Sequence, residues 1–326
     1  MSDAYFFHLM RSLAERSGEA AISQLGFANI PIRHRLRELF EEPYGATGAF
    51  LADPAFEAAF GWKTADRLIG DLEEGLLTRE LVNAMDQAGD YAFKRQMFPY
   101  QHQMRSWELL SGQDPQSLVV TSGTGSGKTE CFMVPILDHL ARQRREHGPL
   151  VGVRALFLYP LNALINNQRN RLRAWTEPFG GDIRFCLYNG NTPERPERAA
   201  RQKGAPSEVL DRQSLRSLPP PILVTNSTML EYMLVRTQDS PILEQSQGKL
   251  EWVVLDEAHT YIGSQAAEVS LLLRRVIHAF GVAPEQVRFI ATSATIGDPE
   301  GPAGAELRRF LADVAGVHIE RVLDSG

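Results

Sequence analysis

A glycine-rich stretch that follows an apolar run has the residue types for binding phosphate. Residues 117–132 read SLVVTSGTGSGKTECF. The three glycines let the backbone curl so that its N–H groups point at phosphate oxygens, and the positive end of the following helix adds to the attraction. Lys128 would reach the β- and γ-phosphates of a nucleotide, and the Thr129 hydroxyl would bind Mg²⁺. The stretch therefore predicts a phosphate-binding loop for ATP and Mg²⁺.

This loop differs at one position from the strict pattern G-x-x-x-x-G-K-[S/T]. The pattern requires glycine at position 122, where this chain has Ser122. A known variant has a small residue there and a third glycine, here Gly125, two positions before the last. A glycine-rich turn that binds nothing is the alternative, but the strand before the turn and the helix after it favour the nucleotide loop. The predicted loop contacts are Thr124, Gly125, Ser126, Gly127, Lys128, Thr129 and Glu130.

The stretch FPYQHQMRSWELL (98–110), upstream of the loop, offers a side chain that can recognise a base. A glutamine can accept and donate a hydrogen bond to adenine at the same time. Gln103 is our first candidate for this contact and Gln101 the second, and Tyr100 could stack on the base. An ordinary polar helix start is the alternative.

An acidic pair follows a second apolar run, in LEWVVLDEAHTY (250–261). Asp256 and Glu257 come at the carboxyl end of the predicted strand, where open α/β sheets bind ligands. Asp256 would bind Mg²⁺ together with Thr129, and Glu257 would be the general base for the attacking water. His259 is either a core histidine or a link from this site to the loop of the next strand.

The next apolar run, QVRFIATSATIG, ends in short hydroxyl side chains. Ser293 and Thr295 could hydrogen-bond the acidic group and pass its state onward. A Ser-Ala-Thr tripeptide alone is a weak signal, so its meaning comes from its position one strand after the acidic pair.

Strand-like and helix-like runs alternate after about residue 96, which predicts the scaffold for these residues. The predicted strands are 118–121, 153–159, 183–188, 221–225, 251–256, 287–292 and 317–323. The predicted helices are 128–142, 161–176, 226–236, 262–280 and 303–314. Nearly continuous apolar strands are typical of a parallel sheet that helices cover on both faces. We therefore predict an α/β P-loop domain, with a mostly parallel sheet, over residues 96–326.

Residues 1–95 show helical spacing of apolar residues and predict a helical accessory region. LTRELVNAMDQA (77–88) is one amphipathic segment, with Thr78 as a possible N-cap. The polar, proline-rich stretch 193–221 is interpreted as an excursion on the surface.

Composition limits the class of protein. A chain of 326 residues predicts about two domains. No apolar run is long enough to span a bilayer, and the first residues do not form a secretory signal. The two cysteines, Cys131 and Cys186, have no C-x-x-C partner, so we expect neither zinc nor a disulfide, and a cytoplasmic location. The net charge of −6 argues against binding nucleic acid through bulk charge, so such contacts would be local.

Taken in order, GTGSGKT, YPLNALINNQ, TNSTMLEYML, DEAH and SAT resemble the first, RecA-like motor domain of superfamily 2 DEAH-box helicases, over residues 98–323. YNGNTP (188–193) and the run 256–276 are similar to the MrfA-like group of bacterial DNA helicases, whose relatives include subunits of antiphage defence systems. That group has Tyr-Arg-Gly after the DEAH histidine, whereas this chain has Tyr261, Ile262 and Gly263. The role of that arginine is therefore in doubt here.

The resemblance implies nucleic-acid contacts on loops that follow strand ends. These residues are Pro160, Leu161, Asn162, Gly190, Asn191, Thr225 and Asn226. For Arg169, Arg171 and Arg173 a solvated helix face is favoured over nucleic-acid contacts, and Arg274 and Arg275 could equally be residues that flank the core.

In such helicases ATP lies between two motor domains, and the second supplies arginine fingers. We find no second phosphate-facing domain and no arginine-finger motif after SAT, so we expect the N-terminal part of an ATP-dependent helicase or translocase. It would be weakly active without a second motor domain from the rest of the protein or another chain. DNA is favoured over RNA, although RNA helicases share every motif, and no membrane partner is expected. The alternative is a nucleotide-gated interaction module of a larger complex.

Overall fold

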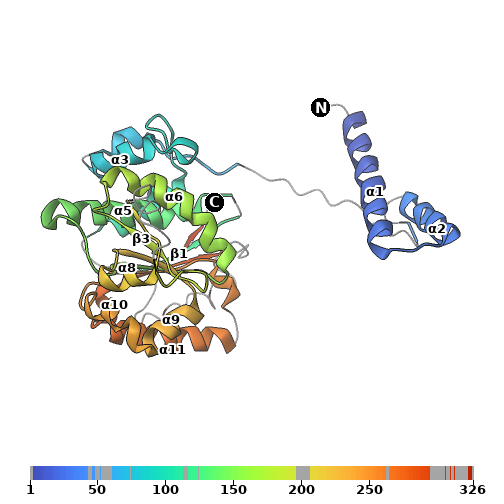
Figure 1. Cartoon of the computed structure of the whole chain (residues 1–326). Coiled ribbons are helices and arrows are strands. Elements are labelled where there is room, and N and C mark those ends of the chain that lie inside the picture. Colours follow the sequence, from blue (N-terminus) through green and yellow to red (C-terminus); the bar gives the residue numbers. More distant parts are fainter. Residues whose placement is uncertain are drawn as a thin grey trace. The chain divides into compact units, whose positions relative to one another are not determined.

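The computed structural model describes residues 3–42, 46–47, 52, 61–73, 75–112, 117–123, 125–195, 206–261, 264–293, 305, 309, 312 and 322–324. The chain forms two compact units, Met1–Gly61 and Trp62–Gly326 (Figure 1). No helix in the described ranges has the length and apolar character needed to cross a membrane.

The described residues of the first unit form two helices, in agreement with the helical region predicted from the sequence. Helix α1 (Asp3–Leu25) contacts helix α2 (Ile30–Glu41). Asn29 caps α2, because its side chain accepts a hydrogen bond from the backbone N–H of Ile32 at 3.2 Å. An exposed ion pair joins the two helices through Arg37 and Glu19. Such an exposed pair contributes little stability in water.

The second unit is built on a sheet in which every recorded strand pair is parallel. Its strands are β1 (Leu118–Thr121), β2 (Ala155–Leu158), β3 (Phe185–Leu187), β4 (Glu208–Val209), β5 (Ile222–Thr225), β6 (Trp252–Leu255), β7 (Arg288–Ser293) and β8 (Val322–Asp324). Within the described residues the strand order is β4-β3-β5-β2-β6-β7-β1-β8. Strand β1 therefore lies between β7 and β8, and β6 and β7 separate it from β2, the next strand in the sequence.

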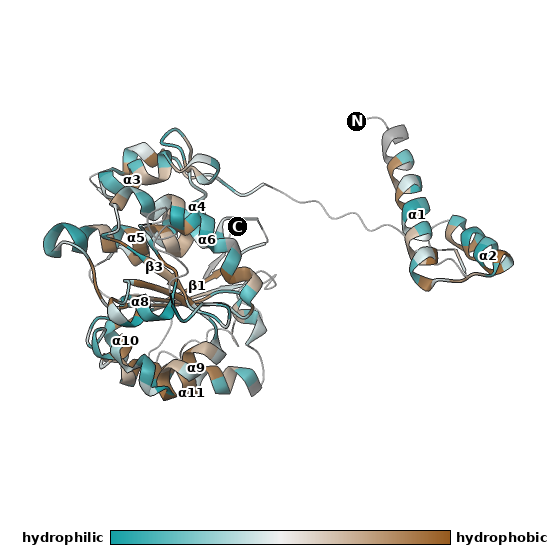
Figure 2. Cartoon of the chain, viewed as in Figure 1, coloured by the Kyte–Doolittle hydropathy of each residue, from teal (hydrophilic) through white to brown (hydrophobic). Residues whose placement is uncertain are grey.

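Helices cover both faces of this sheet (Figure 1). One face carries α3 (Arg79–Asp86), α4 (Gln101–Leu110), α5 (Lys128–His147) and α6 (Asn162–Thr176). The other carries α8 (Arg212–Ser217), α9 (Ser227–Val235), α10 (Ser240–Glu244) and α11 (Ser264–Ala279). Successive strand residues point to opposite faces, so Leu118 and Val120 belong to one core and Val119 to the other. The central strands are mostly apolar (Figure 2), and the parallel sheet with helices on both faces confirms the predicted fold class.

Residues 62–95 pack with the sheet unit, so the compact division falls well before the boundary expected near residue 95. Thr78 caps α3 as expected, and its backbone N–H donates to the Asp138 carboxylate of α5 at 2.5 Å. Trp175 of α6 donates its indole N–H to the carbonyl of Tyr91 at 3.0 Å. The apolar stripe of α3 is therefore covered by α5 and α6 instead of forming a separate core.

The stretch 193–221 holds more structure than a surface excursion, because it contains β4 and α8. Glu208 of β4 is buried and pairs with Arg169 at 2.7 Å and with Arg173 at 2.5 Å. Both arginines stay partly exposed, as on a solvated helix face, but each is also paired to a buried carboxylate. The predicted helix 303–314 lies almost entirely outside the described residues, and β8 overlaps the end of the predicted strand 317–323.

Candidate active site

The phosphate-binding loop connects the end of β1 to the start of α5. Gly127 precedes the helix with φ of 76°, in the left-handed region. A Cβ at this position would lie 2.2 Å from Nε2 of Gln103, so only glycine fits. The first N–H groups of α5 have no partners within the helix and are directed at this loop, which suits a phosphate. Thr124 lies outside the described residues.

Lys128 is held inside the loop. Its Nζ donates to the carbonyl oxygens of Ser122 at 2.9 Å and Gly123 at 3.2 Å. Burial lowers the pKa of Lys128, and the charges of Glu257 and Asp256 oppose that shift. The acidic pair therefore lies within electrostatic reach of the loop lysine.

Ser122 shows why the loop tolerates a residue other than glycine at its first position. The Ser122 hydroxyl hydrogen-bonds the hydroxyl of Ser126 across the loop. Its backbone N–H donates to the carbonyl of Ser293 at 3.2 Å. A small hydroxyl residue thus closes the loop and ties it to the end of β7.

Gln103 lies beside the loop, whereas Gln101 is exposed at the start of α4. The Gln103 Oε1 accepts from the backbone N–H of Tyr100 at 2.9 Å, and its Nε2 donates to the carbonyl of Gly127 at 3.2 Å. A glutamine amide has two donor hydrogens and two acceptor lone pairs, so one of each remains for a base. These two bonds fix the orientation of the amide.

Glu130 faces α6 through its side chain. Its carboxylate pairs with Arg171 at 3.1 Å, and its carbonyl accepts from the indole N–H of Trp107 at 2.9 Å. Arg171 is therefore paired to a carboxylate while it stays partly exposed. The part of Glu130 that remains for a phosphate is its backbone N–H in the first turn of α5, beside partly exposed Thr129.

Asp256 is a buried carboxylate at the end of β6. The Thr292 hydroxyl donates to its Oδ1 and accepts from the backbone N–H of Glu257 at 3.3 Å. Burial raises the pKa of Asp256, the Thr292 hydrogen bond opposes this, and the charge of Glu257 adds to it. A buried carboxylate whose ionised form is disfavoured gains from a cation beside it, so the donor set fits Mg²⁺.

Glu257 has a strained backbone. Its φ is 52°, the one positive value among described residues other than glycine. For a side chain of this kind the left-handed region costs about 1–2 kcal/mol. The carbonyl of Glu257 accepts two bonds from Thr260, from the backbone N–H at 2.9 Å and the hydroxyl at 2.8 Å, which hold the turn. Such strain persists where the surrounding structure imposes it, and it clusters at functional sites.

His259 connects the acidic residue to the next strand. Its Nδ1 lies 3.3 Å from Oε2 of Glu257 and 3.5 Å from the hydroxyl of Ser293. The histidine is partly exposed, so it is not a core residue. Thr295 lies outside the described residues.

The strand order brings the phosphate-binding loop, the acidic pair and Ser293 to neighbouring carboxyl ends of the sheet. Strand β7 pairs with β1 through Ser293 and Thr121, and with β6 through Ala291 and Leu255. Parallel neighbours end at the same side of the sheet, so the loop, the acidic pair and Ser293 share that edge. Thr292 was not singled out from the sequence, although a hydroxyl beside Ser293 in an otherwise apolar strand was a usable signal.

The predicted nucleic-acid contacts lie at the carboxyl ends of β2, β5 and β3 or on the loops that follow them. The Asn226 side chain caps α9, accepting from the N–H of Met229 at 2.8 Å, and its Nδ2 donates to Oδ1 of Asn162 at 2.8 Å. Thr225 donates to the carbonyl of Tyr188 at 2.7 Å. Pro160 is partly exposed, and Leu161 is exposed beside Asn162.

The loop after β3 carries the remaining two, Gly190 and Asn191, both exposed. The N–H of Asn191 donates to the side chain of Asn189 at 2.9 Å. Arg212 of α8 donates to the carbonyls of Thr192 at 2.9 Å and Asn189 at 3.3 Å, and so fixes the loop. Nothing in the sequence indicated this role for Arg212, because it stands outside every motif.

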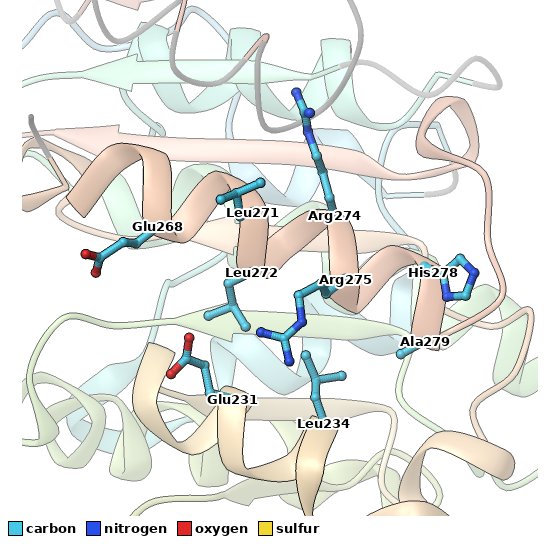
Figure 3. A pocket seen from close by; sticks show the side chains of 9 residues that line it. All are labelled: Glu231, Leu234, Glu268, Leu271, Leu272, Arg274, Arg275, His278 and Ala279. Atoms are coloured by element: carbon cyan, nitrogen blue, oxygen red, sulfur yellow. The ribbon is translucent and has the colours of Figure 1, made fainter. Parts of the chain in front are cut away.

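A groove of about 760 Å³ lies between α9 and α11 and holds none of the predicted site residues (Figure 3). Its lining residues are Glu231, Leu234, Glu268, Leu271, Leu272, Arg274, Arg275, His278 and Ala279. Arg274 and Arg275 are exposed residues of α11.

A family model described as DEAD/DEAH box helicase matches residues 100–300. The Druantia protein DruE of Escherichia coli (strain UMEA 4076-1) is 29% identical over 333 residues, which cover 72% of this chain and 18% of DruE. The uncharacterized ATP-dependent helicase YprA of Bacillus subtilis (strain 168) is 29% identical over 230 residues, 68% of this chain and 26% of YprA.

Among solved structures, the DUF1998 helicase MrfA bound to DNA and AMPPNP is similar with a TM-score of 0.57 and 25% identity. The match covers 82% of this chain and 31% of that one. This chain thus spans less than a third of the length of each of these relatives.

Proposed function

Because the chain belongs to the DEAD/DEAH box helicase family, we propose that its sheet unit binds ATP with Mg²⁺ and hydrolyses ATP as the first motor unit of a nucleic-acid helicase or translocase. The observation that carries the proposal is the convergence of Lys128, Asp256 and Glu257 at one edge of the sheet. Their electrostatic coupling, in the shifted pKa values of Lys128 and Asp256, supports a shared ligand.

Each residue has a separate task in this proposal. Lys128 and the first N–H groups of α5 bind the phosphates, and Gln103 binds the adenine. Thr129 and Asp256 hold Mg²⁺, which neutralises phosphate charge when bound. Glu257 takes the proton of the attacking water, and His259 keeps its carboxylate oriented. Ser293 and Thr295 are proposed to couple the acidic site to the segment after β7, with Ser293 beside His259.

The loops beyond β2, β5 and β3 form the proposed nucleic-acid surface. The Asn162–Asn226 pair joins two of these loops, and Arg212 fixes the third. Because the predicted contacts are uncharged, they would bind the sugar-phosphate backbone through amides and hydroxyls, without reading bases. DNA is favoured as the track, since the MrfA structure contains DNA.

A second motor domain, in the remainder of a longer protein or in another chain, would complete the ATP site. Losing its arginine finger costs about 10³–10⁵ in rate, so this chain alone should hydrolyse ATP slowly. The similarity to the Druantia protein DruE supports work beside other subunits of an antiphage defence system. DNA repair is the other setting that we propose, in either case in the cytoplasm.

Isothermal titration calorimetry with ATP and Mg²⁺ tests the ATP site. The chain should bind ATP, and Lys128→Ala should not, whereas Lys94→Ala, at an exposed lysine, should bind as the unaltered chain does. Absence of ATP binding by the unaltered chain, with and without Mg²⁺, would refute the proposal. Fluorescence anisotropy with single-stranded DNA and RNA of one sequence then compares the two tracks.

A nucleotide-gated interaction module is the second candidate function, and the separate helical unit Met1–Gly61 favours it. It predicts tight binding of a partner protein. It also predicts no ATPase stimulation by nucleic acid, even after a second motor domain is supplied. Stimulated hydrolysis in that mixture would exclude it.

A further inference from the structure

Trp62, the first residue of the sheet unit, lies against the phosphate-binding loop. A Cβ added at Gly123 would be 3.9 Å from its Cζ2 atom, and one added at Gly125 would be 3.9 Å from its Cη2 atom. The edge of the indole therefore occupies the side of the loop on which these two residues lack side chains.

The backbone holds Trp62 in this place. The adjacent Lys63 accepts a hydrogen bond at its carbonyl from the N–H of Gln101 at 2.9 Å, and the N–H of Ala65 donates to the carbonyl of Pro99 at 2.7 Å. The Trp62 ring also meets that of Tyr100, with centroids 5.7 Å apart. The start of α4, which carries Gln103, thus positions the indole as well.

We infer that Trp62 is a positioning residue of the nucleotide site, whose indole backs the glycine-rich loop and holds it ready for phosphate. Glycine loses more conformational freedom than other residues when it is ordered, so a loop with three glycines binds weakly unless something restrains it. Trp62 restrains two of them. It lies before the 100–300 match, so the family motifs do not include it. The inference rests on the proposed ATP binding.

Calorimetry with two probes, ATP with Mg²⁺ and inorganic tripolyphosphate, tests this role. We expect Trp62→Ala to weaken binding of both about tenfold, because the loop glycines regain freedom. Trp62→Phe should recover part of the loss, and Met97→Ala, at an exposed apolar residue of the neighbouring segment, should bind both probes unchanged. Loss for ATP alone would overturn the inference, because it would show contact with the base and not with the loop.

Tryptophan emission gives a second measurement that does not depend on hydrolysis. The chain has four tryptophans, and Trp107, Trp175 and Trp252 are at most 1% exposed, whereas Trp62 is partly exposed. Adding ATP should change the emission of the unaltered chain and leave that of Trp62→Phe unchanged. If Trp62→Ala binds ATP as tightly as the unaltered chain, the inference fails and the proposed function stands. If the unaltered chain binds no ATP, the proposed function fails first.

Discussion

Replacing Thr292 by valine removes one hydroxyl from the acidic strand end and nearly preserves the shape of the side chain. In the fully buried Thr292, this hydroxyl donates to the Asp256 carboxylate and accepts from the N–H of Glu257. Valine can do neither. The Glu257 N–H retains a second acceptor, Oδ1 of Asp256 at 3.2 Å, so the main loss falls on Asp256.

The size of the effect follows from these contacts. A hydrogen bond to a charged group contributes about 1.5–3 kcal/mol, so Thr292→Val should lower the free energy of unfolding by about that amount at pH 8. Burial already raises the pKa of Asp256, and loss of this bond raises it further. A raised acid pKa means that Asp256 favours folding while protonated and loses that contribution as pH rises through the folded pKa. The cost of the valine should therefore shrink at acid pH.

Urea unfolding followed by circular dichroism, at pH 8 and pH 5, measures the free energy of unfolding and its dependence on pH. Thr292→Ser keeps the hydroxyl and loses a buried methyl group, so it should cost about 1 kcal/mol at both pH values. A valine variant within about 0.5 kcal/mol of the unaltered chain at pH 8 would refute the reasoning, since a charged hydrogen bond cannot be lost so cheaply. A serine variant as unstable as the valine variant would refute it too.

Three further predictions concern the loop, the nucleic-acid surface and the opposite end of the sheet. Gly127→Ala should weaken ATP binding at least about tenfold in calorimetry, because its Cβ would collide with Gln103 and its φ is positive; unchanged affinity would show that the loop does not bind phosphate as proposed. Binding of single-stranded DNA should depend weakly on salt, with a log–log slope no steeper than about −2 in anisotropy titrations, because the proposed contacts are uncharged; a steep slope would point to lysines and arginines. Burial would raise the pKa of Glu251, but hydrogen bonds from His139 and Gln143, together with the charges of His139 and Arg154, hold that pKa below its usual value. Glu251 therefore stabilises the fold above its usual pKa, and this contribution is lost as pH falls through the lowered folded pKa. Glu251→Gln should then flatten the fall of the melting temperature at acid pH. An unchanged fall would contradict the lowered pKa of Glu251.

The sequence predicted the central strands well because each is an apolar run with a turn at its end. It also favoured Gln103 over Gln101, and the structure places Gln103 beside the loop. It could not show what covers α3, since an apolar stripe indicates a buried face without identifying the surface that buries it.

Polar segments were harder to interpret because their partners lie far away in the sequence. Glu208 stands in a charged, proline-rich stretch, and its burial depends on two arginines of α6. Arg212 acts on a loop that ends 20 residues earlier, and Thr292 on a strand end 36 residues earlier. Spacing within a motif carries no information about such partners, because the fold alone brings them together.

The place of β1 in the sheet determines when the nucleotide site can form during synthesis. Ser117, just before β1, bonds to Phe289 in β7 across 172 residues, and the other neighbour of β1 is β8. A ribosome adds about 5–20 residues per second, so β7 is synthesised on the order of 10–30 s after β1. Until then β1 has no strand partner, so the nascent chain would carry a complete phosphate-loop sequence and still be unable to bind ATP.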